Sequence, residues 1–182
     1  MPNTVTIFQN IRETETPFFK DVTYILQRIK EGKNQELVKK IRQEKNKTKR
    51  NDLKKNLPAI CFSGQFNKRS DSAIVEHSGL ICLDFDGYPK KKDLLEDKER
   101  FQKNKFIYSV FVSPSGNGLK VLVKIPADQD NHSKYFNSLK KEFDSAYFDT
   151  TSKNLSRVCY ESYDRLLHIN PNSSLWDKIE EL

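Results

Sequence analysis

Cysteine is scarce in this sequence, with only three among 182 residues. Cys61, Cys82 and Cys159 lie far apart, and no two of them form a Cys-x-x-Cys pair. This spacing excludes the common zinc-binding patterns, and the odd number excludes a framework in which every cysteine is disulfide-bonded. We therefore expect the protein to work in a reducing, cytoplasmic setting.

Long hydrophobic runs, a signal peptide and clustered histidines are also missing. No stretch approaches the roughly 18 apolar residues that a membrane helix needs, and the N-terminus has no apolar signal-peptide core. We therefore expect no membrane partner. Because His77, His132 and His168 are scattered along the chain, we expect them to be surface or packing residues rather than ligands.

Positive charge is in excess, with a net charge of +7. Such an excess favours polyanionic partners such as nucleic acid or nucleotides. Nine cations lie within residues 39–55, and a second group, Lys90 to Lys92, lies further along the chain. The nine are Lys39, Lys40, Arg42, Lys45, Lys47, Lys49, Arg50, Lys54 and Lys55. They form either a solvated helix face or a surface that follows the backbone of a nucleic-acid template.

Hydrophobic periodicity predicts a mixture of strands and helices. Strands are expected at 4–11, 59–66, 80–86, 106–113, 119–125 and 157–164. Helices are expected at 21–30 (with Asp21 as a cap), 35–55, 91–104 and 132–147, and the tail 166–182 reads as a loop followed by a short helix. The two strands joined by Pro-Ser-Gly-Asn-Gly predict a central β-hairpin. This order favours a two-layer α+β domain with a largely antiparallel sheet.

The segment ICLDFDG places two acids in an apolar strand. Side chains two residues apart point to the same face of a strand, so Asp84 and Asp86 project together. Two neighbouring carboxylates repel each other, and a divalent cation offsets that repulsion. The alternative is that one acid caps the following turn and the other is solvated.

The hairpin loop SPSGNGLK carries groups that suit phosphate. Glycine lets the backbone approach an anion closely, and hydroxyls and a lysine add hydrogen-bond donors. The residues are Ser113, Ser115, Gly116, Gly118 and Lys120. A plain turn is the alternative interpretation. Further along, Asp149 is either the cap of a turn or a third carboxylate of a metal site, and Arg157 is placed for phosphate or for an acid partner.

Together these motifs resemble the archaeo-eukaryotic primase superfamily, the primase-polymerases, and especially the VirE N-terminal-like primase domains of mobile-element replication proteins. The segments that carry the resemblance are LPAICFSGQFNKR, HSGLICLDFDG, FVSPSGNGLKVLV and FDTTSKNLSRVCYESYD. The resemblance covers a catalytic core at 57–171, which implies an RRM-like sheet. Residues 1–56 would be an N-terminal strand and basic helical part of the same domain, and 172–182 a tail or linker.

The resemblance also implies an activity, which is template-directed nucleotidyl transfer by a two-metal mechanism with Mg²⁺ or Mn²⁺. Asp84, Asp86 and Asp149 would hold the metals, and the hairpin, with Lys120 where many members of the superfamily have histidine, would contact the triphosphate. Arg157 would bind nucleotide. The implied partners are a single-stranded DNA template, nucleoside triphosphates and a helicase domain or protein.

Two rival interpretations remain. A haloacid-dehalogenase-type phosphatase also has an apolar strand ending in Asp-x-Asp-Gly, with the first Asp as nucleophile; however, that motif normally begins its fold, whereas about eighty residues precede it here. The second rival is a nucleic-acid-binding module without catalysis, which would not need three acids. The sequence favours neither de novo priming nor primer extension. It also indicates no preference between ribonucleotides and deoxynucleotides.

Overall fold

The computed structural model describes residues 3–180, and its centre is a four-stranded antiparallel sheet. The strand order is β10-β7-β8-β6, and the bounds are Leu80–Asp86 (β6), Ile107–Val112 (β7), Gly118–Lys124 (β8) and His168–Ile169 (β10). β7 and β8 form the predicted central hairpin, and β8 pairs with β6 on its other side. The predicted α+β class with an antiparallel sheet is confirmed.

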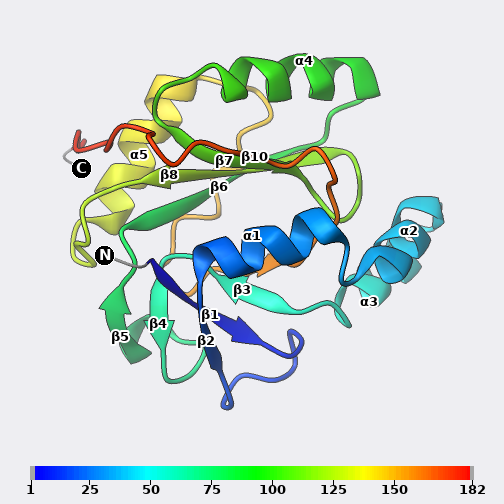
Figure 1. The fold of residues 1–182 in the computed structure, drawn as a ribbon, viewed down its shortest axis with the longest axis horizontal. Helices are drawn as coiled ribbons and strands as arrows, with labels where there is room; N and C mark the ends of the chain where they lie inside the picture. The colour runs from blue at the N-terminus through cyan, green and yellow to red at the C-terminus, as the bar shows by residue number, and fades with distance from the viewer. Residues whose placement is uncertain (1–2, 181–182) are drawn as a thin grey trace.

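Two helices cover one face of this sheet (Figure 1). They are α4 (Lys91–Gln102) and α5 (His132–Phe143). From β6, Ile81, Leu83 and Phe85 alternate onto this face and pack in one apolar cluster with side chains of both helices. This alternation leaves the intervening residues of β6 on the opposite face of the sheet.

The opposite face packs against helix α1 and a second antiparallel sheet. α1 spans Val22–Glu31, and the Asp21 side chain accepts a hydrogen bond from the Thr23 N–H, so the predicted N-cap is confirmed. The second sheet has the order β2-β1-β3-β9, with bounds Thr4–Phe8 (β1), Phe18–Asp21 (β2), Ala59–Cys61 (β3) and Cys159–Tyr160 (β9). A small sheet pairs β4 (Gly64–Phe66) with β5 (Ile74–His77), which follows a 3₁₀ turn at Asp71–Ala73.

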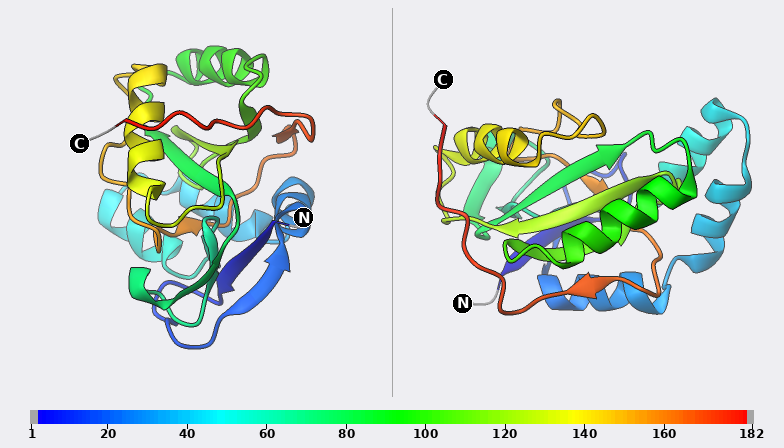
Figure 2. Two further views of the ribbon diagram at one scale, coloured as in Figure 1. Left: turned by 90° about the vertical axis from the view of Figure 1, so that its left-hand side faces the viewer. Right: turned by 90° about the horizontal axis from the view of Figure 1, so that it is seen from above.

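The basic segment folds as two helices rather than as the single helix predicted over 35–55. α2 spans Gln35–Gln43 and α3 spans Lys47–Lys54. The chain is extended between them, and the Asn46 side chain accepts a hydrogen bond from the Lys49 N–H, which caps α3. An asparagine at this position competes with continued helix and starts a new one. Figure 2 shows both helices at one end of the molecule, beside the β7–β8 hairpin.

Several other boundaries differ from the prediction. The strand predicted at 59–66 is two strands, because the chain turns at residues 62–63 between β3 and β4. The strand predicted at 157–164 is only the two-residue β9. α5 ends at Phe143 because Asp144 adopts the left-handed conformation (φ 35°), so residues 144–147 are not helical. β2 and β5 were not predicted.

The C-terminal tail is extended and is held against the core. Between residues 166 and 180 the structure has β10 and no helix, so the predicted short helix is wrong for the described part of the tail. Trp176 is 2% exposed, and its backbone N–H donates to the Lys124 carbonyl at 2.8 Å. No helix within residues 3–180 is both long and apolar enough to cross a membrane.

Candidate active site

The two acids of β6 lie on the face that the helices α4 and α5 do not cover. Leu80 and Cys82 pack on this face against α1 and the second sheet. Asp84 and Asp86 continue the same side of the strand toward its end, where the apolar cluster gives way to polar side chains. Asp84 is buried and Asp86 is exposed at the rim. The predicted same-face projection of the pair is confirmed.

Asp149 is brought to this pair by backbone pairing with β6. Phe148 forms an isolated antiparallel bridge with Phe85. The Asp149 N–H donates to the Asp84 carbonyl at 2.8 Å, and the Asp86 N–H donates to the Tyr147 carbonyl at 2.8 Å. As a result, one carboxylate oxygen from each of the three aspartates lies within 4.8 Å of the other two.

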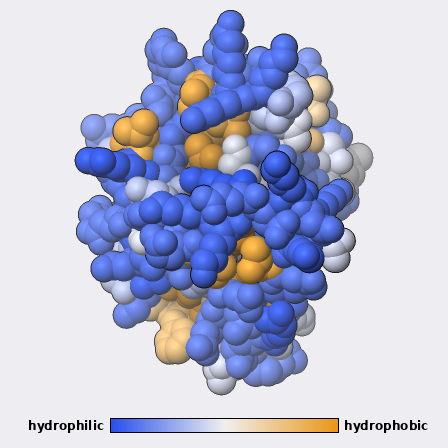
Figure 3. Space-filling model, turned by 90° about the vertical axis from the view of Figure 1, so that its right-hand side faces the viewer, coloured by the Kyte–Doolittle hydropathy of each residue, from blue (hydrophilic) through white to orange (hydrophobic). Residues whose placement is uncertain are grey.

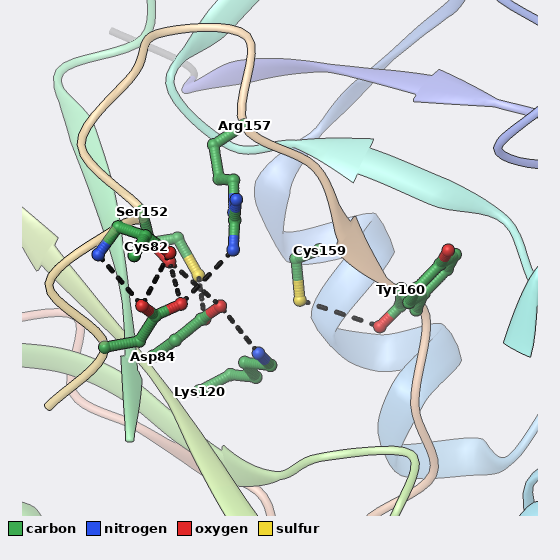
Figure 4. A network of polar contacts seen from close by, with 9 residues as sticks. Cys82, Asp84, Lys120, Ser152, Arg157, Cys159 and Tyr160 are labelled. Atoms are coloured by element: carbon green, nitrogen blue, oxygen red, sulfur yellow. Dashed lines mark hydrogen bonds and ion pairs between the residues drawn. The ribbon is translucent and has the colours of Figure 1, made fainter. Parts of the chain in front are cut away.

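Hydrogen bonds fix the orientation of the Asp149 carboxylate. It accepts bonds from the Ser152 hydroxyl at 2.6 Å, from the Thr151 N–H at 2.9 Å and from the Arg157 guanidinium at 3.2 Å. Burial alone would raise the pKa of Asp149, but the Ser152 and Thr151 bonds and the Arg157 charge outweigh it and lower that pKa. Asp149 therefore both caps a turn and completes the acidic group, so the two roles left open by the sequence coexist. Figure 4 shows Ser152 and Arg157 beside Asp84.

Lys120 neutralises part of the acidic group. It lies directly opposite Asp84 in the β6–β8 pairing, and its amine is 2.8 Å from the Asp84 carboxylate (Figure 4). Burial alone would lower the pKa of Lys120, but the charge of Asp84, together with that of Asp86, outweighs burial and raises that pKa above its ordinary value. Lys120 is thus a permanent cation inside the site.

The Asp86 carboxylate packs closely against the backbone of Gly118 in the β7–β8 hairpin. A β-carbon added to Gly118 would lie 2.4 Å from the Asp86 Oδ1, which explains why β8 begins with glycine. Loss of solvent raises the pKa of Asp86; Lys120 opposes this rise, whereas Asp84 and Asp149 add to it. The protein therefore disfavours the charged form of Asp86. This is expected for a carboxylate that lies close to other negative charges.

A pocket of about 350 Å³ opens beside these carboxylates. Its lining includes Asp84, Asp86, Ser113, Ser115, Lys120 and Arg157 among the predicted residues, and Lys54, Pro114, Val158, Cys159 and Tyr160 besides. Ser113 is 4% exposed, and its hydroxyl has no hydrogen-bond partner within the described residues. Gly116 does not line the pocket; it has φ +81°, and a β-carbon there would lie 3.3 Å from the Arg42 side chain.

The donor set of the acidic group suits a hard divalent cation. Three carboxylates converge, and Mg²⁺ and Mn²⁺ prefer oxygen ligands. Lys120 balances the charge of Asp84, whereas burial and the neighbouring carboxylates raise the pKa of Asp86, so the protein groups leave part of the acidic charge uncompensated. The residues present therefore fit a Mg²⁺ or Mn²⁺ site.

Sequence reasoning missed three features. Ser152 connects two of the acids: its hydroxyl donates to Asp149 and lies 3.5 Å from Asp84. Lys54 lines the pocket, although the sequence singled it out only as one member of a basic run. His77 and His132, expected to be surface or packing residues, are both buried and are in contact through ring nitrogens 3.0 Å apart, a contact that the sequence did not predict. The position of each of these side chains depends on strand register or on tertiary packing. Local sequence predicts neither of these.

Residues 52–167 match the family described as "BT4734-like, N-terminal domain". The chain belongs to this family. The BT4734-like segment contains Lys54, the whole β7–β8 hairpin and all three aspartates of the site. No curated protein matches the chain. Among solved structures, the chain is similar to the AEP domain of the primase-polymerase of cyanophage S-2L, with a TM-score of 0.47 and 14% identity over 96% of this chain and 83% of that chain.

Proposed function

We propose that this protein is a nucleotidyltransferase of the primase-polymerase type, which copies a single-stranded DNA template during replication of a phage, plasmid or other mobile element. The observation that supports it most strongly is the convergence of Asp84, Asp86 and Asp149 beside a cationic pocket. The motifs that resemble the primase superfamily supply these same residues. The combination favours nucleotidyl transfer because that chemistry needs both an acidic metal site and a cradle for phosphates.

Each part of the site has a role in this reaction. In nucleotidyl transfer, the 3′-hydroxyl oxygen bonds to the α-phosphorus of a nucleoside triphosphate, the bond to pyrophosphate breaks, and the hydroxyl proton passes to solvent. Mg²⁺ or Mn²⁺ held by the three aspartates would lower the pKa of that hydroxyl and stabilise charge on the leaving pyrophosphate. Ser113, whose buried hydroxyl is unpartnered within the described residues, would donate to a phosphate oxygen.

The cations of the site would act on different partners. Lys120 orients the Asp84 carboxylate through their 2.8 Å contact, and its remaining N–H bonds would face the triphosphate. Arg157 holds Asp149 at 3.2 Å and lines the pocket, so it would bind nucleotide from the side of β9. Ser115 and Gly116 lie in the loop between β7 and β8, and Gly118 begins β8. A helicase domain or protein would supply the unwound template.

The proposal is tested by template-directed synthesis with Asp86→Asn. This variant keeps the Asp84–Lys120 ion pair, whereas a change at Asp84 would leave Lys120 as an uncompensated cation. With single-stranded DNA, Mn²⁺ or Mg²⁺ and nucleoside triphosphates, the unmodified protein should make or extend a complementary strand. Asp86→Asn should slow synthesis by roughly a hundredfold or more, the effect of losing a group that stabilises transition-state charge.

The matched control is Glu96→Gln, which removes one exposed carboxylate from α4, away from the pocket. It should retain full activity. DNA binding by Asp86→Asn should be unchanged or slightly tighter, because a negative charge is lost. Release of inorganic phosphate from a generic ester without a template, together with no nucleotide incorporation, would favour the phosphatase interpretation. DNA binding with neither activity would favour the non-catalytic module.

A further inference from the structure

The helical pair α2–α3 is fixed beside the pocket. Arg42 of α2 donates hydrogen bonds to the Ser113 carbonyl at 3.2 Å and to the Tyr163 carbonyl at 2.8 Å, so α2 is tied to the hairpin loop. α3 follows after a short extended link and places Lys54, near its C-terminal end, in the pocket lining. Figure 3 shows the end of the molecule that carries these helices, and this face is mostly hydrophilic.

Cations gather where α3 meets the pocket. The charged groups that act on Lys54 are Arg50, Lys120 and Lys47, with Asp86 as the acid among them. Loss of solvent and then repulsion from Arg50 and Lys120 lower the pKa of Lys54. Within residues 3–180, no carboxylate oxygen lies within 4 Å of the Lys54 amine. The Arg50 Nε is buried and has no hydrogen-bond partner among the described residues.

The acids nearby do not balance this charge. Asp52, the only acid of α3, contacts Lys55 at 2.8 Å. Asp84 is already paired with Lys120. Crowded cations on a half-buried wall are unfavourable unless an anion joins them, because burial removes the solvent that would screen their repulsion.

We propose that Lys54 binds the β- and γ-phosphates of the nucleoside triphosphate and so forms one wall of the triphosphate site. This inference deepens the proposed function and rests on it. The ligand is the nucleotide rather than the template because Lys54 lines the pocket with Asp84 and Asp86. The exposed Lys47 and Lys49 are instead free to follow a nucleic-acid backbone.

The chain offers a matched pair of variants for the test. Lys54→Ala removes the pocket cation, and Lys55→Ala removes an equal charge from the next residue, which is paired with Asp52. Each variant and the unmodified protein are titrated with a nucleoside mono-, di- and triphosphate in the presence of Mg²⁺ and without a template. Lys54→Ala should weaken triphosphate binding about tenfold or more, the value of one charged hydrogen bond. Monophosphate binding should change by no more than roughly twofold.

Lys55→Ala should bind all three nucleotides like the unmodified protein, and thermal melting should show both variants folded. If nucleotide binding depends on Asp86 but Lys54→Ala behaves like Lys55→Ala, the inference is wrong while the proposed function stands. If the unmodified protein binds no nucleotide, the proposed function itself fails. A parallel titration with single-stranded DNA completes the test: a loss confined to DNA would assign α3 to the template and overturn the inference.

Discussion

At the scale of single residues, we expect the buried contact between His77 and His132 to make stability depend on pH. The His77 Nδ1 accepts the Gly79 N–H at 3.0 Å, so in the neutral pair its Nε2 carries the proton and donates to the His132 Nδ1. Burial lowers the pKa of His77 to about 4, opposed by Asp128. Burial and the charge of His77 lower the pKa of His132 to about 3.

These shifts predict a loss of stability on acidification. Both folded-state pKa values lie below the unfolded value of about 6.5, so the unfolded chain binds more protons between pH 6.5 and 4. The free energy of unfolding should therefore fall as the pH drops through this window, with a limiting slope of about 1.4 kcal/mol per pH unit for each histidine. Urea unfolding at several pH values measures the slope.

The control for this prediction replaces both rings. The double variant His77→Asn/His132→Leu should have a much flatter stability profile between pH 6.5 and 4. His168→Gln leaves the pair intact and should retain most of the slope, losing only the part due to His168, whose pKa is also lowered by burial and by Lys98. An equal slope in the double variant would contradict the prediction and assign the acid sensitivity to other groups.

The local sequence pattern predicted part of the candidate site. It could not predict contacts that depend on strand register or on bridges between distant segments. The two-residue period of a strand was enough to place Asp84 and Asp86 together. The cross-strand partner of Asp84 was not deducible from local pattern, because the β6–β8 register sets the contact with Lys120. The local pattern left Asp149 open as a turn cap or a third carboxylate, because the bridge that brings it to the pair joins Phe85 to Phe148, 63 residues further along the chain.

At the scale of elements, a buried ion pair anchors α4 to the rest of the fold. The Lys98 amine is 2.6 Å from the Asp164 carboxylate, and both side chains are less than a tenth exposed. Lys98 also donates to the Leu166 carbonyl, while Asp164 accepts the Val112 N–H at the end of β7. The pair thus connects α4, the hairpin and the segment before β10.

Breaking this pair should destabilise the protein strongly. Lys98→Met leaves the Asp164 carboxylate buried without its cation, which costs about 3–5 kcal/mol. Lys92→Met, on the same helix but in an exposed pair with Glu96, should change the free energy of unfolding by less than about 0.5 kcal/mol. Chemical denaturation of both variants measures the difference, and equal effects would show that the buried pair does not anchor α4.

Long, strongly patterned elements were predictable, and short ones were not. β6, the hairpin, α1 and α4 have apolar side chains at regular spacing, and the sequence placed all of them. β2 and β10 are two to four residues long and exist only because neighbouring strands pair with them, so the local sequence does not reveal them. The break between α2 and α3 follows from the cap at Asn46, which the uninterrupted basic composition concealed.

At the scale of the whole molecule, the candidate site lies where separate parts of the fold meet. The central sheet supplies the two acids and Lys120, and the second sheet supplies Cys159 and Tyr160 of β9 to the pocket. The pair α2–α3 supplies Lys54. A ligand bound here contacts parts that are distant in sequence, so its binding free energy should add to the stability of the whole fold rather than to one element.

Mn²⁺ should therefore raise the unfolding temperature. A ligand that binds only the folded state at a hundred times its Kd stabilises that state by about 2.7 kcal/mol. For a chain of this size each kcal/mol shifts Tm by about 2–4 °C, so a rise of roughly 5–10 °C is expected in a thermal melt. Asp86→Asn and Asp149→Asn should each lose most of this shift because each removes one carboxylate charge from the acidic group, whereas Glu96→Gln should keep it. A full shift in Asp86→Asn would mean that Mn²⁺ stabilises the protein at another site, and the acidic group would then lose its assignment as the metal centre.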